Sequence, residues 1–352
     1  MSYVKYNIIY DLIRERWGVW VSAEHLRKIA EKALSSKGVT EAHARLQADL
    51  LIEAELRGLP SHGLQRLPRL VARLAGGLVD PVASGVIRET RPAVFTVDGG
   101  RGLGPVVMMH ALDQLCLRVP AHGIALAAIR NANHIGMLAY YAEAAAARNL
   151  IGIVLTTSEA LVHPYGGTEA MLGTNPIAIG IPTGAEPYIL DLATSRVSMG
   201  KIHHHALTGT PIPEDWAVDA NGRRTTDPEA AKSGAIAPFG EAKGYGLGLG
   251  VELLVAALAG SAFAPEVGGT LDATEVANKG DILILIDPAA GEGSVAGLAA
   301  YLDRLRASRP ADPARPVAVP GDGMRARRAR ALRDGIDLPD ALHTEISALA
   351  EG

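Results

Sequence analysis

Apolar residues recur at helical spacing over the first 80 positions of the chain. One group runs from Leu26 to Leu34 and a second from Ala44 to Ala54. Ser22 and Thr40 precede these groups at positions typical of helix N-caps, and Gly38 between them is typical of a helix stop. The pattern therefore predicts a helical region at the start of the chain.

After Pro81 the pattern changes to short apolar runs, many of them rich in isoleucine and valine, which are typical of strands. Gly136–Asn149 lies between two of these runs, is rich in alanine and predicts a helix. Beyond the last run we expect helices, separated by a proline-rich loop from Ser308 to Pro320. The order predicts a mixed α/β protein. The five expected strands cover residues 93–97, 124–129, 151–156, 177–181 and 281–287.

Two other segments bear on targeting. Residues 1–20 mix apolar and charged positions without the apolar core of a signal peptide, so we interpret them as a short amphipathic helical extension. Leu247–Phe263 is almost wholly apolar but carries Glu252, which favours a buried core helix over a membrane span.

Composition narrows the class of protein. The chain has 352 residues, 48% of them hydrophobic, which suffices for a large core. A net charge of -4 provides no basic field for nucleic acid or an anionic membrane, so we expect small-molecule partners. The single cysteine, Cys116, excludes a disulfide framework and favours a reducing compartment, for which the cytoplasm is our expectation.

Asn131–Gly136 carries the leading catalytic candidate. His134 stands there between a small polar turn and the start of the alanine-rich helix. An imidazole titrates near neutral pH and can accept a hydroxyl proton in one direction of a reaction and return it in the other. We therefore expect His134 to exchange a proton with a bound ligand.

The familiar nucleotide motifs are absent or misplaced. Gly291–Ala296 matches G-x-G-x-x-A after a strand, but Pro288–Ala290 separate the glycines from that strand. Too little chain follows to complete a βαβ unit, and no Walker motif occurs. A nucleotide would have to be held in another way.

Metal and hydrolase chemistry are also disfavoured. His203–His205 would point in different directions and lack acidic or cysteine companions, so we interpret them as part of a solvated loop and expect no metal. The arginines between Arg325 and Arg333 are typical of an exposed helix face, with a phosphate contact as the alternative. No G-x-S-x-G nucleophile elbow occurs.

Several polar, glycine-rich segments are hard to explain as core. In the first of them, Arg66 offers a bidentate fork for a carboxylate, and Ser61 and His62 offer hydrogen bonds. The glycine turns of the others could present backbone amides to an anionic ligand. These other segments are 166–176, 191–201 and 243–246.

In this order, the segments closely resemble the type 2 malate/L-lactate dehydrogenase family, which also contains ureidoglycolate, sulfolactate and diketogulonate enzymes and cyclic imino acid reductases. The resemblance runs from about Val21 to about Leu338. Further matching segments are Arg57-Gly58, Leu172–Pro176, Leu190–Ser195, Lys243–Leu247 and Pro320-Gly321.

The resemblance implies a fold that is not Rossmann. It implies a mixed-sheet domain at residues 81–289 that binds the cofactor and a helical domain built from both chain ends, residues 21–80 and 290–352. It also implies a homodimer with sites near the subunit interface. The implied reaction is reversible hydride transfer between NAD or NADP and a small 2-hydroxy or 2-oxo acid, or a cyclic imine.

The resemblance also assigns roles. His134 would accept the hydroxyl proton, and Ser61, His62 and Arg66 would face the substrate. Lys243 would contact the cofactor or stabilise the developing alkoxide. The other implied cofactor contacts are Ser158, Asp191, Leu192, Ala193 and Gly244, with Gly321, Asp322 and Gly323 in a more variable loop.

We therefore expect an NAD(P)-dependent 2-hydroxy acid dehydrogenase acting on malate- or lactate-like acids. A cyclic imino acid reductase, in which His134 would exchange a proton with nitrogen, is the alternative enzyme. A catalytically silent ligand-binding relative is the alternative of a different class. Ala132 replaces a serine common in the family at that position, a departure that bears on substrate identity.

Overall fold

The structure, a computed structural model, describes residues 18–291 and 294–351. Most of the expected helical extension at residues 1–20 lies outside the described residues. Its last three positions belong to a strand, β1 (Gly18–Val21), so the helix prediction is wrong there. β1 pairs antiparallel with β11 (Ile336–Pro339) near the other end of the chain, and local sequence could not reveal that partner.

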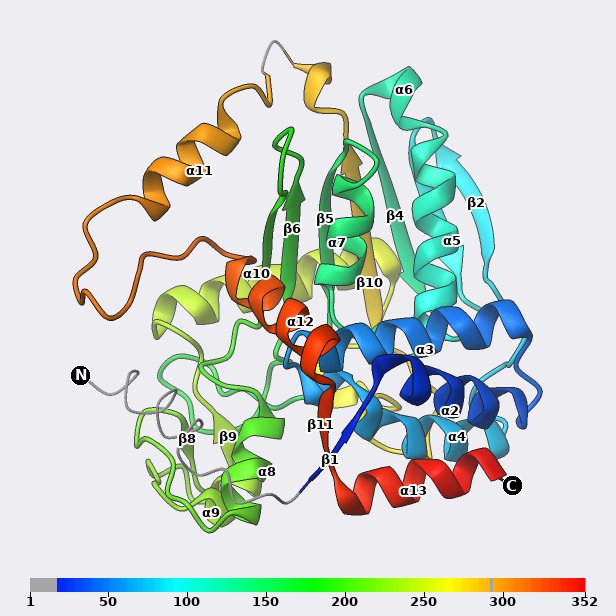
Figure 1. The fold of residues 1–352 in the computed structure, drawn as a ribbon. Helices are drawn as coiled ribbons and strands as arrows, with labels where there is room; N and C mark the ends of the chain where they lie inside the picture. The colour runs from blue at the N-terminus through cyan, green and yellow to red at the C-terminus, as the bar shows by residue number, and fades with distance from the viewer. Residues whose placement is uncertain (1–17, 292–293, 352) are drawn as a thin grey trace.

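A seven-stranded sheet in the order β2-β3-β4-β10-β5-β6-β7 forms the centre of the protein (Figure 1). Only β3 and β4 pair in parallel; the other neighbours are antiparallel. The strands are β2 (Val86–Arg91), β3 (Val94–Asp98), β4 (Ile124–Arg130), β5 (Ile151–Thr156), β6 (Ile177–Ile181), β7 (Tyr188–Leu192) and β10 (Gly280–Ile286).

All five strands expected from apolar runs are confirmed. The two that were not expected, β2 and β7, lie at the edges of the sheet. β2 is almost wholly exposed, so it lacks the apolar run that marks a buried strand.

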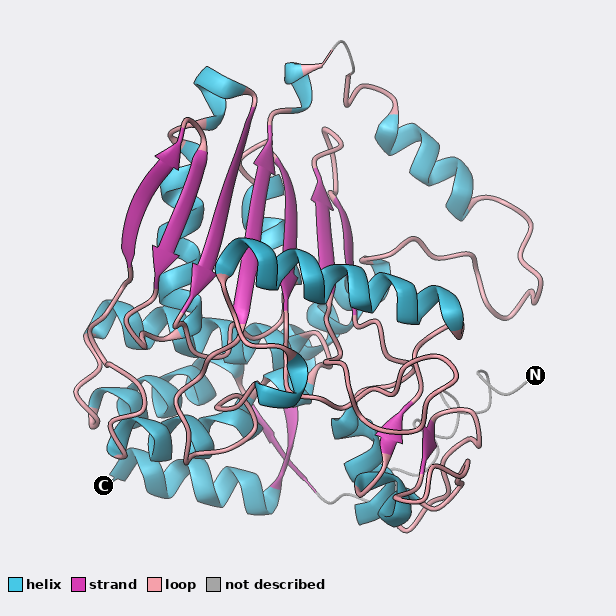
Figure 2. Ribbon diagram, turned by 180° about the vertical axis from the view of Figure 1, so that it is seen from behind, coloured by secondary structure: helices cyan, strands magenta, loops and turns pink. Residues whose placement is uncertain are grey.

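Helices cover both faces of the sheet (Figures 1 and 2). α5 (Gly104–Cys116) and α7 (Ala139–Ala146) pack on one face, and α10 (Ala242–Ala259) crosses the other. Neighbouring strand residues alternate between the two layers, with Leu283 packed beside α5 and α7 and Ile282 packed beside α10. The expected helix at 136–149 is confirmed in a shorter form.

A second hydrophobic core joins the two ends of the chain. It is shared by α2 (Ala23–Ser35), α3 (Glu41–Leu56), α4 (Leu67–Ala75) and α13 (Asp340–Glu351). The expected N-caps are confirmed, because the side chains of Ser22 and Thr40 accept backbone hydrogen bonds at the starts of α2 and α3. Gly38 adopts a left-handed φ of 83° where α2 has ended.

The arginine-rich helix α12 (Asp322–Asp334) docks on α3. The Arg328 guanidinium donates to both carboxylate oxygens of Glu53, at 2.8 Å each, and Arg327 Nε donates to the Arg57 carbonyl at 2.6 Å. No described residue of α12 is buried and Arg327 is exposed, as expected for an exposed helix face, whereas Arg328 is half-buried. Their partners come from α3, far away in the sequence.

A smaller cluster surrounds α8 (Met199–Leu207), α9 (Pro228–Lys232) and the two-stranded ladder of β8 (Ala217–Val218) and β9 (Ala235–Ile236). The loop expected at His203–His205 is wrong, since all three residues lie on α8. His205 is buried with its ring 5.4 Å from that of Trp216, which gives it a packing role.

The apolar helix α10 is buried on one face only. It is the one described helix long and apolar enough to cross a membrane, and a third of it is buried. Glu252 faces inward, where its carboxylate accepts from Asn175 Nδ2 and the Ala264 amide at 2.6 Å each. Leu253, Leu254 and Leu258 remain exposed on the other face. The expected core helix is confirmed for the inner face alone.

The short helices are α6 (Val119–His122) and four 3₁₀ turns, η1 (Pro60–His62), η2 (Leu64–Arg66), η3 (Ala264–Glu266) and η4 (Pro288–Ala290). α11 (Leu298–Arg306) and the loop after it stand away from the body of the protein in Figures 1 and 2. No residue of α11 is buried.

Candidate active site

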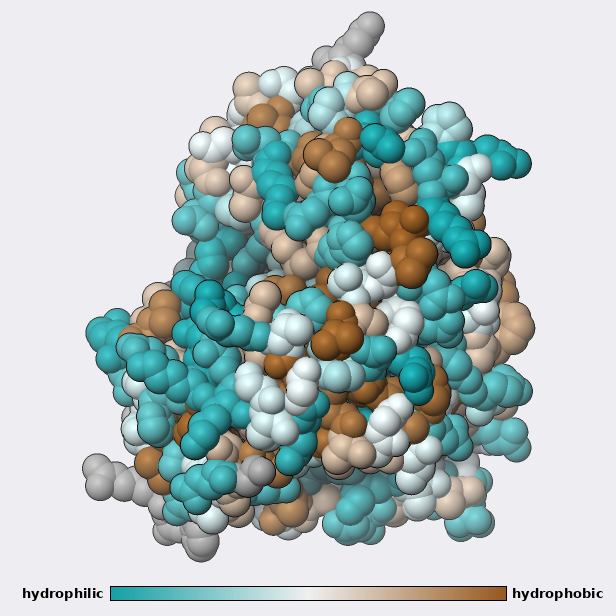
Figure 3. Space-filling view, turned by 90° about the vertical axis from the view of Figure 1, so that its right-hand side faces the viewer, coloured by the Kyte–Doolittle hydropathy of each residue, from teal (hydrophilic) through white to brown (hydrophobic). Residues whose placement is uncertain are grey.

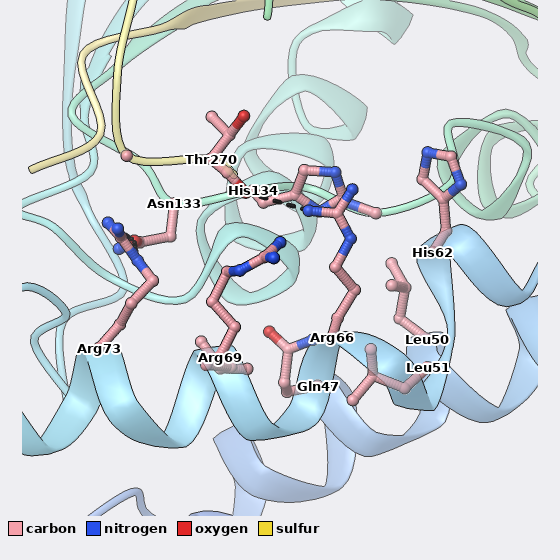
Figure 4. A pocket seen from close by; sticks show the side chains of 13 residues that line it. Gln47, Leu50, Leu51, His62, Arg66, Arg69, Arg73, Asn133, His134 and Thr270 are labelled. Atoms are coloured by element: carbon pink, nitrogen blue, oxygen red, sulfur yellow. Dashed lines mark hydrogen bonds between the residues drawn. The ribbon is translucent and has the colours of Figure 1, made fainter. Parts of the chain in front are cut away.

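A small cavity lies where the helical layer meets the loops at one end of the central strands. Its walls come from α3, the η1–α4 segment, the loop after β4 and the loop before β10. His62, Arg66 and His134, three of the five expected catalytic residues, line it (Figure 4). The cavity is small and partly open to solvent.

His134 is placed by a sharply folded loop. The Gly136 amide donates to His134 Nδ1 at 3.1 Å, which leaves Nε2 as the ring nitrogen available to a ligand. Gly136 has a φ of 73°, and a Cβ there would lie 2.1 Å from a Leu50 methyl. Only glycine fits this turn.

His62 lies beside His134. The two ring centroids are 5.6 Å apart, and the Ser61 hydroxyl is hydrogen-bonded to His62 Nδ1 at 3.0 Å. Ser61 therefore orients His62. Below the turn, Glu55 accepts from the Leu64 amide at 2.7 Å, and burial raises the pKa of that carboxyl to about 7.

Arg66 is partly occupied by the protein. Its Nε donates to the Ser61 carbonyl at 2.8 Å and its Nη1 to the Thr270 carbonyl at 3.0 Å. No protein partner for Nη2 is found within the described residues, so this nitrogen is available to a ligand. Burial, together with the charge of Arg69, lowers the pKa of Arg66 to about 10, and the group stays charged near neutral pH.

Both histidines are held neutral. Burial, followed by the charge of Arg66, lowers the pKa of His62 to about 3. The pKa of His134 is also well below its ordinary value because of burial, then the charge of Arg66 and the neighbouring His62. A neutral imidazole is the form that accepts a proton.

Sequence reasoning missed two further arginines at this cavity, Arg69 and Arg73. Both side chains point toward the His134 loop in Figure 4. Arg73 is buried and donates through Nη2 to the Asn133 side-chain oxygen at 3.0 Å, beside His134. The sequence could have indicated them, because Arg69 and Arg73 follow Arg66 at the spacing i+3 and i+7. Residues at this spacing share one face of a helix.

A loop held by Glu159 closes the cavity. The Glu159 carboxylate accepts from the amides of Thr270 and Leu271 at 2.7 and 2.8 Å, and from the Thr270 hydroxyl. Arg66 and Arg73 donate to carbonyls of the same loop. The loop is therefore fixed to the residues that line the cavity floor.

The expected cofactor residues divide into two groups. Four of them lie together at one end of the strands, because Leu155, Ile177 and Leu192 are in register across β5, β6 and β7. These four are Ser158, Asp191, Leu192 and Ala193. Thr156 lies opposite Asp281 on β10, and the neighbouring Gly280 lies opposite Arg130, the last residue of β4. The His134 loop, which follows β4, therefore leaves the sheet at the same end of the strands. None of the four lines the small cavity.

Asp191 has a structural contact of its own. Its Oδ2 accepts from the Ala139 amide at 2.8 Å, so it caps the start of α7, whose local sequence supplies no cap. Burial raises its pKa to about 6. The contact joins β7 to the helix that follows the His134 loop.

The remaining cofactor candidates lie elsewhere. Lys243 is exposed at the first turn of α10, and Gly244 is buried where a Cβ would lie 2.0 Å from the Phe239 carbonyl oxygen. Gly321, Asp322 and Gly323 form the start of α12, where the Asp322 carboxylate binds Arg306 and Arg325. The structure does not place these groups in the cavity with His134.

Comparison with known proteins identifies the family. Residues 21–347 match the family described as malate/L-lactate dehydrogenase. The chain is 35% identical over 329 residues to L-sulfolactate dehydrogenase of Methanocaldococcus jannaschii, covering 93% of this chain and 95% of that protein. It is 37% identical over 340 residues to Delta(1)-pyrroline-2-carboxylate reductase 2 of Burkholderia multivorans, covering 95% and 98%.

Solved structures agree. A dehydrogenase from Sinorhizobium meliloti superimposes with a TM-score of 0.93 at 62% identity, covering 95% of this chain and 99% of that one. The sulfolactate dehydrogenase structure from Methanocaldococcus jannaschii gives a TM-score of 0.89 at 34% identity, with 95% and 97% covered. The chain therefore belongs to the malate/L-lactate dehydrogenase family of oxidoreductases.

Proposed function

We propose that this oxidoreductase transfers a hydride reversibly between NAD or NADP and a small 2-hydroxy or 2-oxo acid, with malate- or lactate-like acids as substrates. The convergence of His62, Arg66 and His134 on one cavity carries the proposal. The names of the relatives, which include malate and sulfolactate dehydrogenases, support an acid of this class.

Each of the three side chains would meet one chemical need. Arg66 Nη2 would bind the substrate carboxylate, and His134 Nε2 would accept the hydroxyl proton as the alcohol is oxidised. His62, oriented by Ser61, would donate to or accept from the same oxygen. With the carboxylate and the hydroxyl both held, the carbon-bound hydrogen has one fixed direction.

The end of the strands where Ser158, Leu192 and Ala193 lie would hold the cofactor. Bound nicotinamide supplies or accepts the hydride. Ser158, Leu192 and Ala193 are half-buried at this end, so they are open to a ligand while their backbone is fixed by the sheet. Lys243, Gly244 and the segment 321–323 would contact more distant parts of it. Because all but one strand pairing is antiparallel, we infer that the cofactor is bound without a Rossmann crossover.

We also propose the two-part organisation expected above, with the sheet domain at residues 81–289 binding the cofactor and the helices of both chain ends, 21–80 and 290–352, completing the site. The shared core of α2, α3, α4 and α13 supports it. The sole cysteine, Cys116, is free, which fits a reducing compartment such as the cytoplasm.

A substrate panel tests the function. The purified chain is mixed with NAD or NADP and malate, lactate, sulfolactate or ureidoglycolate, and in reverse with the 2-oxo acids and pyrroline- or piperideine-2-carboxylate. We expect absorbance at the reduced-nicotinamide band to change with a hydroxy or oxo acid. Turnover of the imines alone would establish the reductase, which three similar reductases favour, and turnover of nothing would indicate the silent relative.

We further propose a homodimer whose contact includes the outer face of α10. Leu253, Leu254 and Leu258 are 42–51% exposed there, and α11 stands away without a buried residue. On the face shown in Figure 3, by contrast, apolar residues form small groups separated by polar ones. A contiguous exposed apolar helix face is typical of a protein interface.

Sedimentation velocity tests the dimer. We expect a dimer for the unaltered chain and a monomer for the double variant Leu254→Glu/Leu258→Glu. Leu207→Glu is the matched control, since Leu207 is 88% exposed on α8 and should leave the dimer intact. A monomeric unaltered chain that sediments with phospholipid vesicles would instead show that the face binds a membrane.

A further inference from the structure

The cavity carries more positive charge than the proposed reaction uses. Arg66, Arg69 and Arg73 all line it, and none of the described residues lining it is an aspartate or glutamate. One arginine suffices to bind the carboxylate of a 2-hydroxy acid. The other two therefore need separate explanations.

Arg73 is explained by its contacts. It is buried, and its guanidinium donates to the Asn133 side chain and to the carbonyls of Asp272 and Glu275 at 2.9–3.3 Å. Every nitrogen of the group has a protein acceptor. Four of its five N–H groups are thus bonded to the protein, and the Asp272 carboxylate lies 3.8 Å from Nη1, so Arg73 holds the His134 loop and the Thr270 loop together.

Arg69 has no such contacts. No hydrogen bond or ion pair of its side chain is found in the part of the chain that the structure describes, and the residue is exposed at the edge of the cavity. Figure 4 shows its guanidinium between those of Arg66 and Arg73, directed toward the His134 loop. Three like charges repel one another, and the pKa values of Arg66 and Arg73 are lowered by burial and further by Arg69.

Two acids of the neighbouring loops, Glu159 and Asp272, make no ion pair with Arg69 in the described structure. The Glu159 carboxylate accepts its hydrogen bonds from Thr270 and Leu271. Asp272 accepts from the amides of Gly269, Thr274 and Glu275 at 2.7–2.8 Å. A cleft lined by charges of one sign attracts ligands of the opposite sign, here an anion.

We propose that Arg69 binds a second acidic group of the substrate, so that the enzyme prefers a 2-hydroxy acid with a distal carboxylate or sulfonate over a monocarboxylate. This inference rests on the proposed function and names its substrate class. The first carboxylate lies at Arg66, the hydroxyl lies at the two histidines, and the distal group reaches Arg69 at the mouth. The partly open cavity and the exposed position of Arg69 fit this order, because the distal end stays near solvent.

Malate and 2-hydroxybutyrate form a matched pair for the test, since a carboxylate in one replaces a methyl group in the other. The measured quantity is the ratio of kcat/KM for malate to kcat/KM for 2-hydroxybutyrate. We expect Arg69→Met to lower this ratio about tenfold, as for the loss of a charged hydrogen bond. Arg69→Lys should keep part of the preference. Arg45→Met, which removes an exposed charge paired with Glu41 on α3, should leave the ratio unchanged.

Three results would overturn the inference. They are an unaltered enzyme that prefers 2-hydroxybutyrate, an Arg69→Met variant with an unchanged ratio, and a variant whose main defect is a raised KM for the cofactor, which would place a cofactor phosphate at Arg69. If no acid is turned over at all, the proposed function fails. Calorimetric titration of the two acids, with and without NADH, then still decides the role of Arg69. The measured quantity is the ratio of the two dissociation constants, compared between the unaltered chain and Arg69→Met.

Discussion

The two halves of the candidate site are built differently. In the substrate half, side chains converge on a cavity, and Arg66 Nη2 and His134 Nε2 remain available to a ligand. In the proposed cofactor half, Asp191 caps a helix, Gly244 fills a tight contact and Asp322 binds two arginines. Chemistry that moves a proton needs a free side-chain atom, whereas holding a large cofactor needs a fixed backbone edge.

Changes in the substrate half should alter turnover while the fold stays intact. Changes in the cofactor half should also reduce stability, because the same side chains hold structural elements together.

The largest effect is expected for His134→Gln. Removing the group that accepts the hydroxyl proton should lower kcat by about 10²- to 10⁴-fold, with little change in cofactor binding. Stopped-flow turnover and fluorescence titration with NADH measure the two quantities. Near-normal turnover in this variant would remove His134 from the mechanism and leave His62 as the proton acceptor.

Arg66→Met should act next most strongly. Loss of the charged hydrogen bond to the carboxylate is expected to raise KM for the acid by about ten- to a hundredfold and KM for the cofactor far less. Arg73→Met is the control, because four of the five guanidinium N–H groups of Arg73 are bonded to Asn133 and loop carbonyls. It should lower the melting temperature and damage binding of both ligands. If Arg66→Met behaves like Arg73→Met, Arg66 is structural.

Asp191→Ala separates the two roles of that residue. Loss of the cap on α7 should lower the free energy of unfolding by about 1 kcal/mol, measured by urea denaturation. Asp191→Asn keeps an acceptor for the Ala139 amide and should recover most of that stability. If Asp191 also contacts the cofactor, Asp191→Asn will still raise the KM for the cofactor; an Asn variant that is normal in both respects confines Asp191 to the cap.

The smallest effect is expected from pH. Because the pKa values of His134 and His62 lie below the ordinary 6.5, both rings stay neutral and able to accept a proton as the pH falls through 6.5. The kcat/KM for alcohol oxidation should therefore change less than about twofold between pH 8 and pH 6.5. The acid limb should appear only below that range. A limb centred at 6.5 or above would show that the proton acceptor titrates like an exposed histidine.

Stability follows the same protonation states with opposite signs. The unfolded chain binds protons at His62 and His134 between pH 6.5 and the lowered native pKa values, which destabilises the fold as the pH falls. Asp191 and Glu55, with pKa values raised to about 6 and about 7, bind protons first in the native state and oppose this trend.

Local sequence determined much of the secondary structure and some of the chemistry. The apolar runs predicted five strands of the sheet, because a buried strand must be apolar whatever its partners are. The caps at Ser22 and Thr40 were predictable because a cap and its helix are adjacent in sequence. The sharp loop at His134 was also visible, since its asparagines and glycine allow left-handed backbone at Asn131 and Gly136.

Tertiary structure alone decided the contacts between distant segments. The carboxylate that caps α7 comes from β7, the acid that binds Arg328 comes from α3, and β1 pairs with a strand from the far end of the chain. The sequence alone does not distinguish Arg66, Arg69 and Arg73 from one another. The structure does, because Arg66 and Arg73 have protein acceptors and Arg69 has no protein partner in the described residues. Local pattern sets which surfaces are apolar or charged, whereas long-range packing decides which charges are satisfied and which remain for a ligand.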